Sequence, residues 1–134
     1  MKKQIIITAS VLGALAVIAG AFGAHGLQAV LSPKNMEVWH TAVQYQFYHV
    51  FALLYLSTAT RYKTRLINDC YYLFTLGILL FCGSLYLLAC QDLLGWTWLM
   101  FLGPVTPLGG VLFLGGWITL AVAAFIDKLS AANS

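Results

Sequence analysis

The sequence carries very little charge. Its 134 residues include seven basic and four acidic side chains, so 8% of the chain is charged, whereas about 25% is usual in a soluble domain. Apolar residues reach 61%, against about 45–50% in soluble domains. So few charges cannot cover a surface that faces water, which excludes a soluble globular enzyme, a disordered chain and a free nucleic-acid-binding protein. The composition therefore predicts an all-α integral membrane protein.

Metal-binding patterns are also scarce. The three cysteines form neither a CxxC pair nor a Cys/His cluster with zinc spacing, and we interpret them as small packing residues. The acidic residues Glu37, Asp69, Asp92 and Asp127 all lie outside the long uncharged runs. This placement argues against a carboxylate proton relay in the membrane and against a Mg²⁺ or Ca²⁺ site, which needs several oxygen ligands. We expect neither a metal nor a cofactor.

Four long runs contain no charged residue. The segments expected to cross a membrane are residues 5–24, 41–60, 70–90 and 108–126. Each has 19 to 21 residues, and at about 1.5 Å per residue each spans the roughly 30 Å hydrocarbon core of a bilayer. We therefore predict a four-transmembrane-helix bundle that forms a single membrane domain over residues 1–134.

Helix start signals precede two of these spans. Ser32 and Pro33 are typical of a helix start, with serine as the N-cap and proline at the first helical position. Asn68 and Asp69 can cap the third helix.

The last uncharged run is longer than one span. It covers residues 98–126, and 29 residues is long for a single helix at modest tilt. Because glycine and proline are frequent at its start, we place residues 98–107 at the outer interface and begin the fourth span at Leu108. A short re-entrant segment at 98–107 is the alternative.

The basic residues are distributed unevenly between the two sides of the predicted membrane. With the N-terminus inside, six of them fall on the inner side and only Lys34 on the outer side. The inner residues are Lys2, Lys3, Arg61, Lys63, Arg65 and Lys128. This bias predicts that both termini are inside. Cleavage of the first span as a secretory signal is disfavoured, because its 20-residue run is longer than the usual apolar region of about 7–15 residues.

Small residues recur at helical spacing and predict close helix contacts. The glycines expected to pack helices are Gly13, Gly20, Gly23, Gly83, Gly115 and Gly116. Lipid tails are as apolar as leucine, so helices in a bilayer associate through such close packing and through polar pairs. These surfaces either pack the chain's own bundle or serve another copy or a partner subunit.

The polar residues expected within the membrane form a small set. They are His25 near the end of the first span, and Gln44, Tyr45, Gln46 and His49 in the second. The spacing of Tyr45, Gln46 and His49 places all three on one helix face. His49 lies near mid-bilayer, so this face must turn toward protein or water.

Three interpretations of His49 remain open at this point. It can be a neutral imidazole bonded to a backbone carbonyl or to Ser84 or Tyr86, it can line a solute path, or it can bind a metal or haem. His25 differs from His49 by about 8–10 Å in depth, which makes a poor haem pair. We expect His25 to end the first helix, with Gly26 as a left-handed cap.

Several motifs together resemble a known family. Residues 20–27 read GAFGAHGL, residues 45–49 read YQxxH, residues 83–87 read GSLYL, and a PxGG stretch at 107–110 precedes Gly116-Trp117. In order and spacing the chain resembles the domain-of-unknown-function family 423, also called uncharacterised protein family 0382, which has a eukaryotic relative in transmembrane protein 256. The resemblance implies a multi-pass protein of the bacterial cytoplasmic (inner) membrane, and it implies no activity.

Three functions are compatible with these features. The scarcity of ionisable groups in the spans and the many small-residue surfaces favour a non-enzymatic accessory, scaffold or modulator subunit of a membrane assembly. The alternative is a small-solute channel or transporter with a polar face around Tyr45, Gln46 and His49, and a redox or lipid-modifying enzyme is the third possibility. The expected partners are membrane lipids and either a second copy or a larger membrane complex, without nucleic acid.

Overall fold

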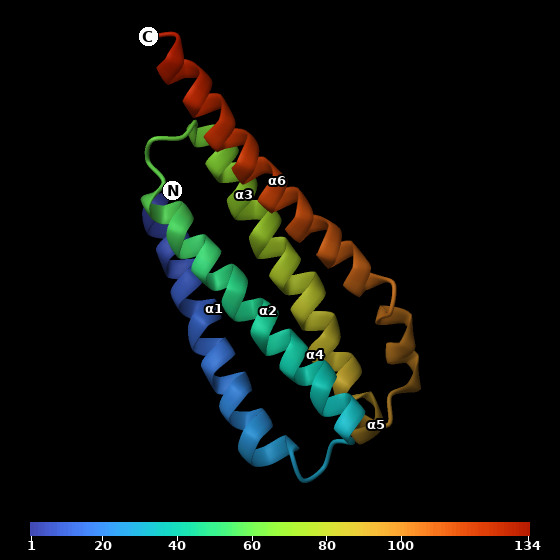
Figure 1. Cartoon of the computed structure of the whole chain (residues 1–134). Coiled ribbons are helices and arrows are strands. Elements are labelled where there is room, and N and C mark those ends of the chain that lie inside the picture. The colour runs from blue at the N-terminus through green and yellow to red at the C-terminus, as the bar shows by residue number, and fades with distance from the viewer.

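The computed structural model describes the whole chain, residues 1–134, as four helical rods joined by short connections (Figure 1). The first rod is α1 continued by the π-helical turn η1, the second is α2, the third is α3, the π-helical turn η2 and α4, and the fourth is α6. The elements are α1 (Lys2–Phe22), η1 (Gly23–Leu27), α2 (Pro33–Thr58), α3 (Thr64–Gly77), η2 (Ile78–Cys82), α4 (Gly83–Ala89), α5 (Gln91–Leu94), the 3-10 helix η3 (Thr97–Leu102) and α6 (Val105–Ala132). The predicted all-α fold is confirmed.

The rods lie side by side, and consecutive rods run in opposite directions (Figure 1). α1 packs mainly against α2, α2 also packs against the third rod, and α6 packs against α3 and η2. The N-terminus, the α2–α3 connection and the C-terminus lie at one end of the molecule, whereas the η1–α2 connection and α5 lie at the other.

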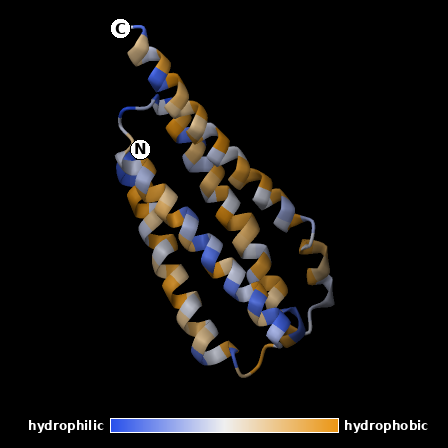
Figure 2. Cartoon of the chain, in the orientation of Figure 1, coloured by the Kyte–Doolittle hydropathy of each residue, from blue (hydrophilic) through white to orange (hydrophobic).

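Three rods are long and apolar enough to cross a membrane by length and composition. They are the first rod (Lys2–Leu27), the third rod (Thr64–Ala89) and the fourth rod taken together with η3 (Thr97–Ala132). The remaining rod, α2, has 26 residues and carries more polar side chains, which appear as blue segments along its length in Figure 2. α2 packs against both α1 and the third rod, so the polar residues on its inner face, Gln46 and His49, lie among apolar helices.

The start of α2 follows the predicted signal. The hydroxyl oxygen of Ser32 accepts a hydrogen bond from the backbone N–H of Asn35 at 3.2 Å, and Pro33 is the first helical residue. The side-chain amide of Asn35 also donates to the Asp92 carboxylate at 3.0 Å, which ties this end of α2 to α5.

The third helix begins earlier than predicted. α3 starts at Thr64, so Asn68 and Asp69 lie within the helix and do not cap it. The additional turn places Ile67 on the inner face, where only 7% of it is exposed and it joins the main hydrophobic core. Burying this side chain contributes about 1.5–3 kcal/mol, more than the roughly 1 kcal/mol of an N-cap.

The last helix also begins before the predicted boundary. α6 starts at Val105 instead of Leu108, and Pro107 occupies its first turn, where a backbone N–H is not required. Gly109 therefore lies in the second turn of α6. The preceding residues form η3, which packs beside α4 with Leu99 buried.

Three glycine–phenylalanine pairs join α6 to the third rod, and we call them the Gly–Phe seam. They are Gly109 with Phe81, Phe113 with Gly77, and Gly116 with Phe74. A Cβ atom at Gly116 would lie 2.5 Å from the Phe74 ring, and one at Gly109 would overlap the backbone of Phe81. The absence of these Cβ atoms allows α6 to approach the third rod closely.

The other glycines expected to pack helices have different surroundings. A Cβ atom would meet side chains at ordinary van der Waals distances at three positions: Gly13 (Val50, 3.4 Å), Gly20 (Val43, 3.7 Å) and Gly115 (Leu73, 3.7 Å). At Gly83 nothing lies within 4 Å, so the predicted helix contact is not formed there within the chain. Gly83 follows the π-helical turn η2 and lines an open groove beside α1.

Candidate functional site

Two buried polar side chains near the middle of α2 form the centre of the candidate site. Gln46 and His49 are three residues apart on the same helix face, and each is only 4% exposed. Both lie among apolar helices, where a polar group without a partner is costly. Their hydrogen bonds therefore decide what the site can do.

Gln46 joins three rods. Its side-chain Nε2 donates to the backbone carbonyl of Leu12 in α1 at 2.7 Å, and its Oε1 accepts from the hydroxyl of Tyr86 in α4 at 2.7 Å. Hydrogen bonds between membrane helices contribute about 0.6–2 kcal/mol each. Gln46 therefore fastens α2 to its neighbours on both sides.

His49 joins α2 to α6. Its Nδ1–H donates to the carbonyl of Tyr45 at 2.7 Å, and its Nε2 accepts from the indole Nε1–H of Trp117 at 3.1 Å. The imidazole also stacks on the ring of Phe113 with a centroid distance of 3.6 Å and an interplanar angle of 7°. Because a carbonyl can only accept and an indole N–H can only donate, these partners select the neutral tautomer with the proton on Nδ1.

The sequence did not identify Trp117 as the partner of His49. Ser84 and Tyr86 were the expected neighbours, but Ser84 shares a hydrogen bond with Thr106 at 2.6 Å and Tyr86 bonds to Gln46. The available signal was the indole N–H of Trp117 itself, which needs an acceptor when it lies in an apolar helix.

Of the other predicted site residues, only Tyr45 lies beside this centre. Its ring is 39% exposed, stacks beside the His49 imidazole at a centroid distance of 6.3 Å and packs against Phe81. Gln44 is exposed on the opposite, outward face of α2. His25 is exposed in η1, and the helix continues through it to Leu27, which is buried. Gly26 is therefore not a left-handed cap, because Gly95 is the only residue with a positive φ.

A second polar contact explains why a glycine stands in η1. The indole Nε1–H of Trp39 donates to the carbonyl of Ala19 at 2.9 Å, and its ring packs on Tyr86 at a centroid distance of 4.6 Å. A Cβ atom at Gly23 would lie 2.6 Å from the indole nitrogen. Gly23 thus provides the space that Trp39 occupies against the first rod.

Two grooves flank α2. One, of about 400 Å³, lies between α1 and the third rod, with Gln46 and Tyr86 among mainly apolar lining residues. The other, of about 560 Å³, lies between α2 and α6 and is lined by aromatic and apolar side chains that include Tyr48, Tyr55 and Trp117. No group of three or more His, Cys, Asp or Glu side chains is close enough to share a metal ion.

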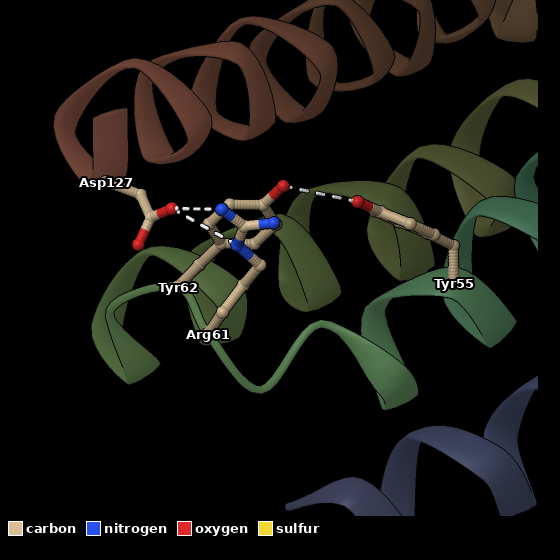
Figure 3. Close-up of polar contacts among 4 residues, drawn as sticks. All are labelled: Tyr55, Arg61, Tyr62 and Asp127. Atoms are coloured by element: carbon tan, nitrogen blue, oxygen red, sulfur yellow. Dashed lines mark hydrogen bonds and ion pairs between the residues drawn. The ribbon is translucent and has the colours of Figure 1, made fainter. Parts of the chain in front are cut away.

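Polar contacts at the end near the termini connect the α2–α3 connection to α6 (Figure 3). The guanidinium of Arg61 donates to the Asp127 carboxylate at 2.8 and 3.1 Å and lies 5.6 Å from the centre of the Tyr62 ring. The hydroxyls of Tyr55 and Tyr62 are 3.4 Å apart. The hydrogen bonds that Arg61 donates to Asp127 raise the pKa of Arg61 above its ordinary value. The pair is exposed to solvent and therefore adds little stability. Its role is to orient the end of α6 relative to the α2–α3 connection.

Comparison with known proteins places the chain in a family. Residues 19–110 match the family model described as "Protein of unknown function (DUF423)". The chain is 40% identical over 123 residues to a UPF0382 membrane protein of Staphylococcus haemolyticus, covering 92% of this chain and 96% of the relative. It is 40% identical over 124 residues to the UPF0382 membrane protein YwdK of Bacillus subtilis, covering 91% and 96%. No solved structure matches the chain. The chain therefore belongs to the DUF423 family and is, like these UPF0382 relatives, a multi-pass helical membrane protein.

Proposed function

We propose that this protein is a non-enzymatic accessory or scaffold subunit that modulates a larger assembly in the bacterial cytoplasmic membrane. One observation carries the proposal: the buried polar groups of α2 bond within the chain, while the outward face of the same helix presents the amide of Gln44. The inward-facing groups form hydrogen bonds that hold the helices of the bundle together. The outward group needs another protein to cover it if α2 crosses the bilayer.

The proposal includes four spans with both termini in the cytoplasm. α2 packs against two apolar neighbours, so it lies in the same layer as α1 and the third rod. The elements that carry Lys2, Lys3, Arg61, Lys63, Arg65 and Lys128 meet at one end of the molecule, and Lys34 lies at the other. This distribution supports an inside location for the end that is rich in basic residues. A fluorescent protein fused to the C-terminus is expected to fold and fluoresce, whereas a periplasmic-type reporter there is expected to stay inactive.

The geometry of His49 favours a structural role over a solute path. Phe113 covers one face of the imidazole, and both ring nitrogens are engaged by Tyr45 and Trp117. A side chain that lines an aqueous path needs free donors or acceptors for water. The hydrogen bonds and the stacking of His49 are those of a packed interior residue.

Native mass spectrometry of the protein, extracted gently from its own membrane, tests the accessory role. We expect a foreign subunit at constant stoichiometry. Preparations that contain only this chain would overturn the proposal. So would a solute flux in liposomes that the wild-type chain supports and the His49→Leu variant abolishes, with the exposed Ile118→Leu variant as a control.

A further inference from the structure

The outward face of α2 is polar along most of its length. Residues three or four apart share one stripe there, opposite the buried face that carries Gln46 and His49. The polar residues of this stripe, which we call the α2 stripe, are Glu37, His40, Thr41, Gln44, Tyr48 and Tyr55. Tyr48 is 55% exposed and Tyr55 is 49% exposed, and both also line the groove between α2 and α6.

Gln44 is the only amide of the α2 stripe. It lies 11 residues from the start of α2 and 14 from its end, which places it about 17 and 21 Å from the two ends. Its amide is exposed and makes no hydrogen bond within the chain. If α2 crosses the bilayer over residues 41–60, Gln44 lies about 5 Å inside the outer edge of the hydrocarbon core, where an amide on a lipid-facing side has few water molecules to bond.

We propose that a second copy of this chain packs on the α2 stripe, with the Gln44 amides of the two copies bonded to each other. This inference rests on the proposed function, since it assumes that α2 spans the membrane and names the partner of its outward face. Two copies with the same topology are related by a two-fold axis along the membrane normal, so α2 pairs in parallel with α2 and Gln44 meets its own equivalent. A primary amide both donates and accepts, and two glutamines can therefore satisfy each other.

The residues that flank Gln44 are also complementary to themselves. At 100° per residue, Glu37 and His40 lie on opposite sides of the line through Gln44, so the two-fold axis brings Glu37 of one copy near His40 of the other. The same operation brings Tyr48 near Phe51 of the second copy, an aromatic pair. No like charges face each other near the midplane. An unrelated partner would require a matching polar stripe of its own, whereas a second copy supplies one.

Disulfide cross-linking in native membranes tests the pairing directly. Gln44→Cys is expected to give an oxidised band of twice the monomer mass. Ile118→Cys, at a position in the middle of α6 that is also exposed, is expected to give none. Both variants are made in a Cys90→Ser background, because Cys90 is only partly buried whereas Cys70 and Cys82 are buried. Equal cross-linking of both variants, or cross-linking of neither, would overturn the proposal.

The contribution of the amide is measured by association in lipid. In a fluorescence energy-transfer titration in bilayers, Gln44→Leu is expected to weaken self-association about tenfold. Gln44→Asn keeps the amide and is expected to retain most of it, and Ile118→Leu serves as the control. An unchanged affinity of Gln44→Leu would refute the role of the amide.

A photo-reactive residue at position 44 separates this inference from the proposed function. Capture of a second copy supports the pairing, whether or not native mass spectrometry finds a foreign subunit. Capture of a different membrane protein supports the accessory role and overturns the pairing. Capture of lipid alone overturns both.

Discussion

Replacing Gly109 by alanine tests the Gly–Phe seam with the smallest possible change. The new methyl group would overlap the backbone of Phe81, which cannot rotate away as a side chain can, so α6 must shift as a whole. Gly83→Ala is the matched control, because a Cβ atom there meets nothing within 4 Å. Both changes replace a helical glycine by alanine, and their difference therefore isolates the steric effect.

The expected magnitude follows from two opposing contributions. Overpacking a close contact costs about 1–3 kcal/mol, and a rigid backbone obstacle places Gly109→Ala at the upper end, about 2–3 kcal/mol. Alanine in place of a helical glycine contributes about 1 kcal/mol of stability to each variant. We therefore expect Gly109→Ala to lose about 1–2 kcal/mol and Gly83→Ala to gain up to about 1 kcal/mol. At about 3–4 °C per kcal/mol for a chain of this size, their melting temperatures should differ by about 6–12 °C.

Native cysteines provide the assay for this prediction. Cys70 and Cys82 are buried, so in a Cys90→Ser background, which removes the partly exposed third thiol, a thiol-reactive fluorogenic dye labels them only when the detergent-purified protein unfolds. Cys70 reports on the seam itself, because its Sγ donates to the carbonyl of Gly116 at 3.5 Å. If the two variants melt at the same temperature, a Cβ atom at position 109 fits beside the backbone of Phe81. The close approach of α6 to η2 would then be refuted.

Three further predictions concern the polar contacts. Trp117→Phe leaves the Nε2 of His49 buried without a donor and should lower stability by about 1–3 kcal/mol, measured by the same thiol assay; a melting temperature like that of the wild type would contradict the bond. Gln46→Leu removes hydrogen bonds to two other rods and should cost about 1–2 kcal/mol, whereas Gln44→Leu, which loses no bond within the chain, should leave the detergent-solubilised monomer unchanged. Arg61→Ala should leave the melting temperature unchanged but speed amide hydrogen exchange around Asp127, since the exposed pair only orients the end of α6; unaltered exchange there would show that the pair does not order this segment.

Much of the helical organisation was predictable because it depends on local chemistry. The Ser32 cap and the fixed backbone angle of Pro33 define the start of α2 without reference to the rest of the chain. The uncharged runs likewise locate the rods, because a charged side chain is costly at any position within an apolar layer.

The start of α3 and the partner of His49 could not be predicted in the same way. Asn68 and Asp69 offered a local cap, but the burial of Ile67 against other rods extended the helix past them. The bond between His49 and Trp117 depends on how far α6 is displaced along α2, and that displacement is set where Gly109 meets Phe81. Such a register is a property of the packed helices and leaves no signal in the spacing of either residue.

The Gly–Phe seam bears on the order in which the chain can assemble. α1 packs mainly on α2 and α6 mainly on the third rod, so the molecule can be divided into two hairpins that meet where α2 packs along the third rod, with Gln46 and His49 bonding across this contact. In the proposed four-span topology each hairpin can enter the bilayer as a unit, and the contacts of the Gly–Phe seam all lie within the second one. Fragments separated in the α2–α3 connection, expressed together, should therefore dock as two preformed halves, with the polar bonds of α2 selecting their alignment.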